Sequence, residues 1–460
     1  MSQRKSRRAL ELLLVALAPL ALVDCAGDDN YGGYPAPPPA TYATLQIIAG
    51  SVDAPPIDVL LDGQPFVTHL DYGQGTGEQR ITATSHSLTV QIETPGAPTT
   101  VIGPTTLDAA ANMDYVVAIE GNLGSVQAPG LSLVTFPHQL AVVPSQSARI
   151  QVLAIQSPIE VYLSAPGASF SSATKVGTAP IGGSVGPMDV SSSQLWIANQ
   201  PISLAGGTDL VFSVLGTIWP PGEGSPPPTP CCPLALSSVD AFGHNSWLSG
   251  PALLENETVR FINDSPDAPA LAVTPVVSTL AYEQVTLRLP LGAPLAIVEP
   301  GLYRYDFSIT PASNPSDVLA SQAADLRVGT FYSVYALGRL AQIAPFITRD
   351  DVRPYSTQAR LRFIQGSPSA QLVDVYLTAS GAAIASAAPT YAAMPFPADT
   401  GYVSYVAGSY DLTVTLADSK TPIIGPTSVT LNNFGVYTAV ARDAPGGGAP
   451  YGLINLDDPY

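Results

Sequence analysis

Residues 259–269 read VRFINDSPDAP, an apolar strand-like run that ends in a turn bounded by prolines. Similar stretches are LRFIQGSP at 361–368 and LQIIAGSVDAP at 45–55, and a degenerate version covers 150–158. The serines of these turns recur about every 105 residues, which is the length of one small β domain. We therefore expect four copies of one unit, marked by Ser51, Ser157, Ser265 and Ser367.

Apolar and polar residues alternate with a period of two in the middle of each unit. In the clearest case Tyr303, Tyr305 and Phe307 share one face of a strand, and Arg304 and Asp306 share the other. This alternation is typical of a strand with one buried and one solvated face. The 46 prolines and 39 glycines punctuate these runs as turns. The sequence predicts an all-β fold of tandem immunoglobulin-like antiparallel β-sandwich domains, in four repeats, after a signal peptide and a Pro-rich stalk.

A further apolar strand closes each unit, as in 114–121, 326–338 and 436–441, and carries a tyrosine near its head. This tyrosine resembles the tyrosine corner of immunoglobulin-like sandwiches. The corresponding run of the second unit, 208–216, has none.

The repeats divide the chain into six segments. We expect a lipoprotein-type signal peptide and a disordered Pro/Gly stalk, then four sandwich repeats, of which the second is degenerate and carries a proline-rich loop at 217–234. The sequence leaves open whether the junctions between repeats are stiff or loose. The expected bounds are 1–25, 26–42, 43–143, 146–252, 256–350 and 356–460.

The N-terminus has the features of an export signal. Basic residues crowd positions 4–8, and residues 12–23 form an apolar stretch that is too short to span a bilayer but typical of a signal-peptide core. Residues 22–26, LVDCA, resemble a bacterial lipobox, which implies a lipid on Cys25 and an outer-membrane lipoprotein. Asp24 departs from the small residue expected before the cysteine. Cleavage near Gly27 and release into the periplasm or the medium is therefore the alternative.

Residues 259–269, 300–303 and 329–338 together resemble the bacterial family of the domain of unknown function 4397. The first and fourth repeats follow its outline less closely, and the second lacks the Asp-Ala-Pro turn. The resemblance implies exported β-sandwich modules, often in tandem and often on lipoproteins. It implies no established activity and supplies no catalytic residues, so we predict none.

The charge balance narrows the possible partners. Eighteen basic residues against 36 acidic ones give a net charge of −18, which repels phosphate backbones and argues against nucleic acid as a partner. We expect contact with a membrane through the lipid anchor, and with an envelope protein or a glycan. The four histidines are His69, His86, His138 and His244. Their spacing is not that of metal ligands, and none of them lies in the third or fourth repeat.

Acidic turn residues are the remaining metal candidates. Asp53 and Asp267 hold equivalent turn positions, Asp264 lies near the second, and loop carboxylates are what calcium requires. Turn chemistry explains these residues as well, because Ser and Asp side chains satisfy turn amides and proline presets the backbone. The fourth repeat has Ser369 at the Asp position. We predict no metal and no cofactor, and keep the three aspartates as secondary calcium candidates.

Cys231 and Cys232 stand in the proline-rich loop. Neighbouring Cα atoms lie ~3.8 Å apart, below the usual disulfide range of about 4.4–6.8 Å, so a vicinal disulfide between them would be strained. Such a bridge, pairing between molecules, and a loop without a role all remain open.

The sequence points to a location and an architecture more than to an activity. We expect a non-enzymatic protein of the cell envelope that acts as a binding, adhesion or structural module. The alternative is a carbohydrate-active hydrolase, which would need two carboxylates about 5–10 Å apart in one cleft.

Overall fold

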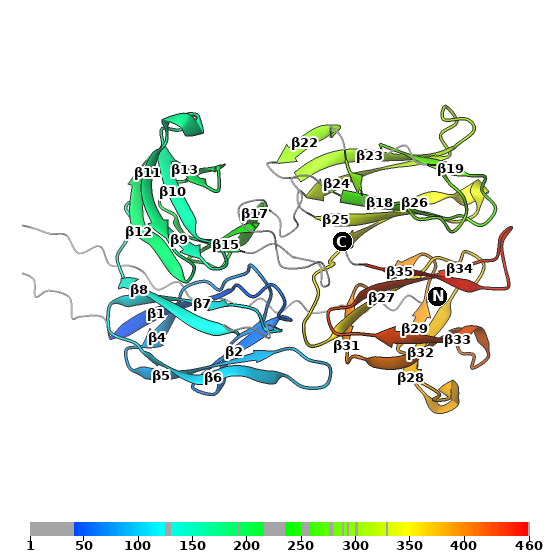
Figure 1. The fold of residues 1–460 in the computed structure, drawn as a ribbon, viewed down its shortest axis with the longest axis horizontal. Coiled ribbons are helices and arrows are strands. Elements are labelled where there is room, and N and C mark those ends of the chain that lie inside the picture. Colours follow the sequence, from blue (N-terminus) through cyan, green and yellow to red (C-terminus); the bar gives the residue numbers. More distant parts are fainter. Residues whose placement is uncertain are drawn as a thin grey trace, which may run out of the picture. The chain divides into compact units, whose positions relative to one another are not determined.

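The computed structural model describes residues 41–124, 130–191, 193–215, 235–249, 258–275, 279–287, 289–291, 294–299, 302–327 and 330–458. Regular elements in these ranges are strands and short 3₁₀ helices, so the predicted all-β fold is confirmed (Figure 1). The predicted signal peptide, Cys25, and the loop with Cys231 and Cys232 lie outside the described residues. Among the described residues, no helix has the length and hydropathy of a membrane span.

The strands form two sheets in each of four sandwiches. We call the sheet that contains the first strand of a sandwich its opening sheet, and the other its second sheet. In sandwich 1 the opening sheet consists, in spatial order, of β4 (Gln79–Thr82), β1 (Tyr42–Ala49), β7 (Met113–Glu120) and β8 (Ser132–Gln139). The second sheet consists of β3 (Gln64–Leu70), β2 (Ile57–Leu61), β5 (Ser85–Ile92) and β6 (Thr99–Asp108).

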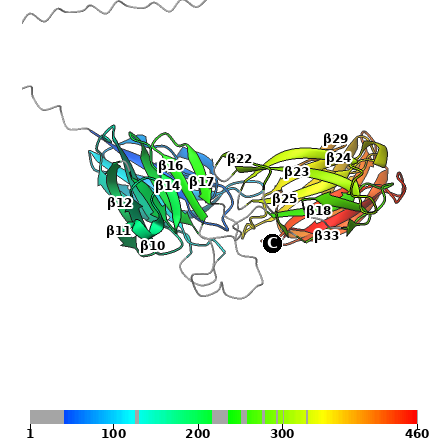
Figure 2. The same ribbon diagram turned by 90° about the horizontal axis from the view of Figure 1, so that it is seen from above.

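Sandwich 2 repeats this plan with longer connections, and most of its strands can be followed in Figure 2. Its opening sheet consists of β12 (Gly183–Ser191), β9 (Ser147–Ala154), β15 (Asp209–Leu215), β16 (Ala235–Asp240) and β17 (Asn245–Ser249). Its second sheet consists of β11 (Thr174–Ala179), β10 (Ile159–Ser164), β13 (Gln194–Ile197) and β14 (Gln200–Ser203), with the 3₁₀ helix η1 (Phe170–Ser172) between β10 and β11.

Sandwich 3 has the opening sheet β21 (Leu289–Pro290), β18 (Thr258–Asp264), β25 (Phe331–Leu337) and β26 (Ala344–Asp350), with η2 (Leu340–Gln342) before β26. Its second sheet consists of β20 (Thr279–Leu280), β19 (Leu271–Thr274), β23 (Leu302–Pro311) and β22 (Ala296–Glu299), and β24 (Ala320–Arg327) also pairs with β23.

Sandwich 4 has the opening sheet β30 (Ala398–Asp399), β27 (Ala359–Gln365), β34 (Val436–Arg442) and β35 (Gly452–Asp457), and β31 (Val403–Tyr405) also pairs with β27. Its second sheet consists of β29 (Tyr391–Met394), β28 (Val373–Ala379), β32 (Gly408–Leu416) and β33 (Pro422–Leu431). The 3₁₀ helix η3 (Ile384–Ser386) lies between β28 and β29.

One pair of strands in each opening sheet is parallel. The first strand of every sandwich runs alongside the closing strand in the same direction, as β1 does with β7, β9 with β15, β18 with β25, and β27 with β34. The second sheets are antiparallel throughout their described pairs. Alternation of side chains does not distinguish the two directions, so the sequence pattern alone does not reveal this pair.

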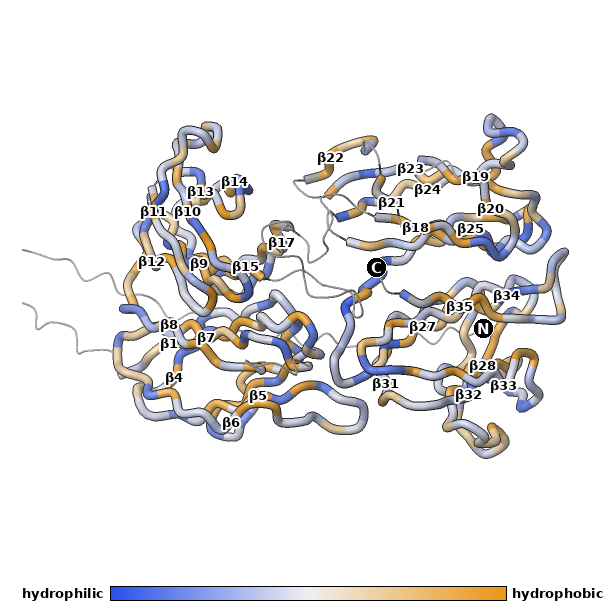
Figure 3. Tube along the Cα trace, in the orientation of Figure 1, coloured by the Kyte–Doolittle hydropathy of each residue, from blue (hydrophilic) through white to orange (hydrophobic). Residues whose placement is uncertain are grey.

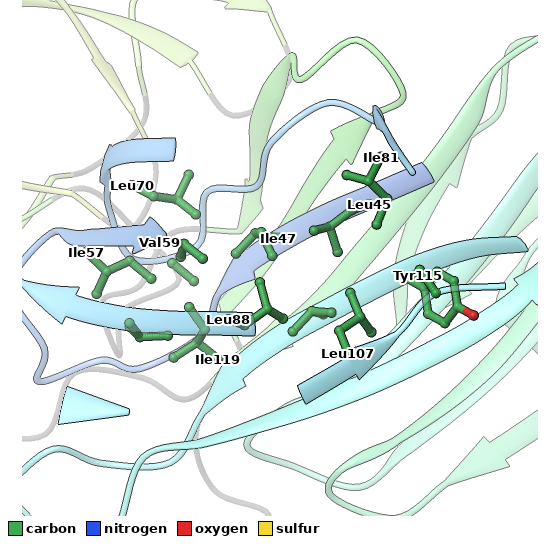
Figure 4. Close-up of a cluster of buried hydrophobic side chains, with 14 of the residues drawn as sticks. Leu45, Ile47, Ile57, Val59, Leu70, Ile81, Leu88, Leu107, Tyr115 and Ile119 are labelled. Carbon is green, nitrogen blue, oxygen red and sulfur yellow. The ribbon is translucent and has the colours of Figure 1, made fainter. Parts of the chain in front are cut away.

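Each sandwich has a core of its own between its two sheets. In sandwich 1, Leu45 and Ile47 of β1 and Ile119 of β7 belong to one cluster with Val59 of β2 and Leu88 of β5 (Figure 4). Similar clusters fill the other three sandwiches. Buried residues alternate with more exposed ones along β5, and polar and apolar residues interchange along many strands (Figure 3).

The tyrosine expected at the head of the closing strand ties that strand to the preceding loop in three sandwiches. Its hydroxyl accepts a hydrogen bond from the backbone N–H five residues earlier; the pairs are Ala110 with Tyr115 (2.9 Å), Arg327 with Tyr332 (3.0 Å) and Asn432 with Tyr437 (3.3 Å). The register of β9 with β15 places Leu210 at the corresponding position of sandwich 2.

The first strands of the opening sheets are buried on both faces, whereas flanking strands such as β4 and β8 are partly exposed. Every residue of β18 and β27 is buried, and so are all but the first residues of β1 and β9. One face packs on the second sheet of the same sandwich, and the other packs on a neighbouring opening sheet. One apolar cluster joins sandwich 1 to sandwich 2 through Ile48 and Leu153, and another joins sandwich 3 to sandwich 4 through Ile262 and Ile364. The sandwiches are therefore paired as 1 with 2 and 3 with 4.

The junction at 351–358, between sandwiches 3 and 4, is held by sandwich 1. The Arg353 guanidinium donates to the carbonyl of Ala54 at 2.6 Å and forms an ion pair with Asp71. The backbone N–H of Ser356 donates to the carbonyl of Asp53 at 2.9 Å. The junction is thus docked on sandwich 1, and residues Ala40–Tyr460 form one compact unit.

Candidate functional site

The signature turn of sandwich 3 fastens the opening strand to the loop that follows the closing strand. Ser265 is fully buried, and its hydroxyl donates to the carbonyl of Gly338 at 2.7 Å. Asp267 accepts a hydrogen bond at 2.7 Å from the backbone N–H of Leu340, the first residue of η2. Both side chains are occupied by backbone partners, so they hold the turn.

Sandwich 1 uses its aspartate in the same way. Asp53 accepts from the backbone N–H groups of Leu123 and Gly124 at 2.8 and 2.7 Å, and from the Ser51 hydroxyl at 3.1 Å. These hydrogen bonds join the turn to the loop after β7. A charged acceptor with several donors is strongly held.

In sandwich 4 the carboxylate is on the loop after the closing strand and not on the signature turn. Ser369 stands at the position of the aspartate and donates to Asp443, which follows β34, at 2.6 Å. Ser367 also donates to Asp443, and the backbone N–H of Gly448 does so at 2.9 Å. The same two loops are thus joined with donor and acceptor exchanged.

The strand registers correct one residue of the predicted series. Gln46 lies beside Val116 and Gln151 lies beside Val211, which aligns the first two sandwiches. In this alignment Gln156, and not Ser157, holds the position of Ser51. The Gln156 side chain donates to the carbonyl of Gly50 in sandwich 1 at 3.0 Å. Ser157 lies one residue later and is therefore not equivalent to the turn serines of the other sandwiches.

The calcium candidates are not brought together. Asp53 lies in sandwich 1, Asp267 is engaged by the backbone, and Asp264 is enclosed between sandwiches 3 and 4. Among the residues that the structure describes, no group of three or more His, Cys, Asp or Glu side chains could hold a metal ion.

Each histidine contacts a single carboxylate. The pairs are His69 with Glu93 (2.7 Å), His86 with Asp62 (2.7 Å), His138 with Asp114 (3.1 Å) and His244 with Asp240 (2.8 Å).

Buried ion pairs connect sandwiches 3 and 4. Arg362 of β27 is completely buried and contacts Asp350 of β26 at 2.9 Å. Arg260 of β18 forms an ion pair with Asp458, which follows β35, and lies 3.8 Å from Asp350. The Tyr402 hydroxyl also donates to Asp458, at 2.7 Å. Both arginines lie in the repeat signature, but the sequence did not indicate that their partners are aspartates of the neighbouring sandwich.

Asp264 is a further buried acid of this interface. In the described part of the chain neither oxygen of its carboxyl group has a hydrogen-bond partner. The Tyr282 hydroxyl donates to the backbone carbonyl of Asp443 at 2.6 Å. Burial, followed by the negative charge of Asp443, raises the pKa of Asp264 well above its usual value, although the Tyr282 hydroxyl is near enough to lower the pKa of that carboxyl group slightly. Its position corresponds to Gly366, where a Cβ atom would lie 2.3 Å from the Asp264 carboxylate.

Several acidic side chains and one arginine, Arg149, lie close together near the interface of sandwiches 1 and 2. Arg149 of β9 binds Asp189 at 2.9 Å and lies 3.8 Å from Asp209. Burial, and then the charge of Asp114, raises the pKa of Glu78 to about 7. Burial raises the pKa of Asp209 to about 6, although the charge of Arg149 opposes this rise.

An open cavity of about 370 Å³ lies on the second sheet of sandwich 2. Phe170 of η1 stacks edge-on against Tyr162, with ring centroids 5.1 Å apart, and lies 5.4 Å from Trp196. Glu160 accepts from the Tyr162 hydroxyl at 2.6 Å and from Lys175 at 2.8 Å. The lining residues are Pro158, Ile159, Glu160, Tyr162, Phe170, Ala198 and Asn199.

This cavity combines apolar rings with a single carboxylate. Lys175 and then Tyr162 lower the pKa of Glu160, so the group is ionised at neutral pH. A glycosidase needs a second carboxylate, and none lines this cavity. The sequence carries no signal for this cavity, because its residues come from separate segments at 158–170 and 198–199 that only the fold brings together.

Comparison with known families gives one match. The model of a family described as "Domain of unknown function (DUF4397)" matches residues 43–158 and 257–376, which together are just over half of the chain. The first range covers sandwich 1 with β9, and the second covers sandwich 3 with β27 and part of β28. No curated protein sequence matches the chain.

Proposed function

We propose, from the premise that this chain belongs to the DUF4397 family, that it is a non-enzymatic module of the cell envelope, in which paired sandwiches form a scaffold that carries a binding surface. The observation that supports this proposal is the use of the polar residues that the repeats share. Ser265, Asp267 and Asp53 hold turns, and Arg260 and Arg362 hold an interface. These shared groups are therefore engaged in structure and are not available for catalysis.

The export part of the proposal rests on the N-terminal sequence. The basic residues at 4–8, the apolar stretch at 12–23 and Cys25 suit a lipoprotein signal. Fractionation of the native bacterium tests it: the full chain is expected in the outer-membrane fraction, and Cys25→Ala is expected to move it to the periplasm or the medium. Wild-type protein found only in the cytoplasm would contradict export.

The binding part rests on the cavity of sandwich 2. Aromatic rings supply contact area at low conformational cost, and a carboxylate and an amide can accept and donate hydrogen bonds to hydroxyl groups. A glycan fits this chemistry, with its apolar ring face on Phe170 and its hydroxyls toward Glu160 and Asn199.

A glycan array probed with the full-length protein tests this role. Phe170→Ala is expected to lower the bound signal at least tenfold, whereas Phe242→Ala, an aromatic that is 85% exposed on the same sandwich outside the cavity, is expected to leave it unchanged. Absence of any glycan signal would reject the binding role and leave a structural spacer. A signal that is unchanged in Phe170→Ala would place the binding surface elsewhere.

A further inference from the structure

The arginines of sandwiches 3 and 4 occupy one equivalent position of the repeat. Arg260 on β18 lies beside Ser333 of β25, and Arg362 on β27 lies beside Thr438 of β34. Each arginine donates through Nε to that neighbouring hydroxyl, at 2.7 and 3.0 Å.

The acids are equivalent as well. Asp350 lies opposite Phe331, the first residue of β25. Asp458 is in the same place relative to β34, because its backbone N–H donates to the carbonyl of Val436, the first residue of that strand. The hydroxyls of Ser333 and Thr438 donate to the carboxylate of their own sandwich.

The short ion pairs run between the sandwiches in both directions. Arg260 of sandwich 3 contacts Asp458 of sandwich 4, and Arg362 of sandwich 4 contacts Asp350 of sandwich 3 at 2.9 Å. Arg260 lies farther from the acid of its own sandwich, at 3.8 Å. A two-way exchange of identical groups is the mark of an isologous interface, in which the same surface patch is used on both sides.

The other pair uses the same face with different groups. Gln46 and Gln151 hold the arginine positions, and Val116 and Val211 hold those of the hydroxyls. His138 lies opposite Asp114, where sandwiches 3 and 4 have their aspartates. The apolar cluster that includes Val116 and Val211 fills this interface.

We infer that the opening sheet is a self-association surface of this module, and that the arginine–aspartate exchange determines which copy it accepts. A sandwich with arginine and aspartate accepts another of the same kind. Sandwiches 1 and 2 have glutamine at the arginine position, and sandwich 1 has His138 at the aspartate position. Against such a sandwich the buried guanidinium would lose the aspartate that it contacts, and the aspartate would lose its arginine, which disfavours that pairing. The chain therefore assembles as 1 with 2 and 3 with 4 and avoids the mixed pairs.

Variants of the full-length chain that remove one of the two arginine–aspartate contacts test this inference. Arg260→Gln introduces the residue of sandwiches 1 and 2, and Asp458→Asn neutralises the acid that Arg260 contacts. Each single variant leaves one buried charge without its opposite charge, and the double variant removes both charges. We expect amide hydrogen exchange in β18 and β27 to accelerate at least about tenfold in each single variant and to return to within about threefold of wild type in the double variant.

The strands β23 and β32 of the second sheets should keep their protection from hydrogen exchange in all variants. This result would separate loss of pairing between sandwiches from loss of folding. The exposed pair Arg304 and Asp325, with a 2.6 Å contact on the second sheet, provides the matched control: Arg304→Gln and Asp325→Asn should leave exchange in β18 and β27 unchanged. Single variants that exchange as slowly as wild type, or a double variant as fast as the faster single one, would overturn the inference.

Discussion

Asp264 links the stability of the interface between sandwiches 3 and 4 to the proton concentration. Burial raises the pKa of its carboxyl group in the folded chain, whereas the unfolded chain ionises it near its ordinary value of about 4. The favourable contribution of the protonated form is therefore complete below about pH 4 and is lost as the pH rises toward the folded-state pKa. Arg442, which contacts Glu283 at 2.9 Å, limits this loss but does not abolish it.

Asp264→Asn should remove this dependence, because the amide has nearly the same shape and does not ionise. We expect the stability of the variant relative to wild type to increase between pH 5 and pH 8, by at most about 1.4 kcal/mol per pH unit. Thermal unfolding at several pH values measures the difference. A difference in melting temperature that stays constant with pH would contradict the assigned shift.

Gly366 faces that carboxyl group, and its lack of a side chain is required by close packing. In Gly366→Ala the new Cβ would lie 2.3 Å from the Asp264 carboxylate and 2.8 Å from the carbonyl oxygen of Ala441. We expect a destabilisation of about 1–3 kcal/mol, measured by urea unfolding. Gly130→Ala is the control, since nothing lies within 4 Å of its added atom.

At the scale of strands and turns, the signature motif fixes how the opening strand leaves the sheet. Sequence alternation predicted β5, β23 and β32, and β5 and β23 do have a more exposed face. In β32 the polar residues of the alternation, such as Thr413 and Thr415, are buried as well. The alternation did not reveal that β18 and β27 are buried on both sides, although an arginine within an otherwise apolar run was a readable signal. A lone charge in such a run has to meet a partner from elsewhere in the fold, and its identity depends on tertiary packing.

The turn itself allows a direct test. Asp53→Ala removes the acceptor of two backbone N–H groups and of the Ser51 hydroxyl, so we expect a loss of about 1–3 kcal/mol in the free energy of unfolding. Chemical denaturation measures it, with the exposed Asp317→Ala as the control. If both variants were equally stable, the hydrogen bonds of Asp53 would not stabilise the fold.

At the scale of the whole molecule, the junction at 351–358 turns two separate pairs of sandwiches into one unit. Its residues Val352, Arg353 and Tyr355 are buried, and Arg353 reaches Ala54 and Asp71 of sandwich 1. The sequence placed this junction between two repeats but could not show that a third repeat covers it, because a linker and a docked segment have the same polar and proline-containing composition.

Arg353→Ala should therefore release the junction. We expect limited proteolysis to cut at 351–358 at least tenfold faster than in wild type, while the sandwiches stay intact. Arg349→Ala, which removes an exposed arginine from the neighbouring β26, should not change the rate. Unchanged cleavage in Arg353→Ala would mean that the remaining contacts, such as Ser356 with Asp53, hold the junction alone.

The glycine at the centre of each interface has a consequence for how such chains diverge. Gly366 meets Asp264 in one pair, and Gly50 meets Ile155 in the other, where an added Cβ would lie 2.6 Å from the isoleucine. A dimer of separate, identical subunits has to place the same residue on both sides of its twofold axis. Joining the copies in one polypeptide lifts that requirement, so one copy can keep the small residue while the other acquires an acid or a bulky group. Tandem duplication thus permits asymmetric contacts that a homodimer of the same fold could never select.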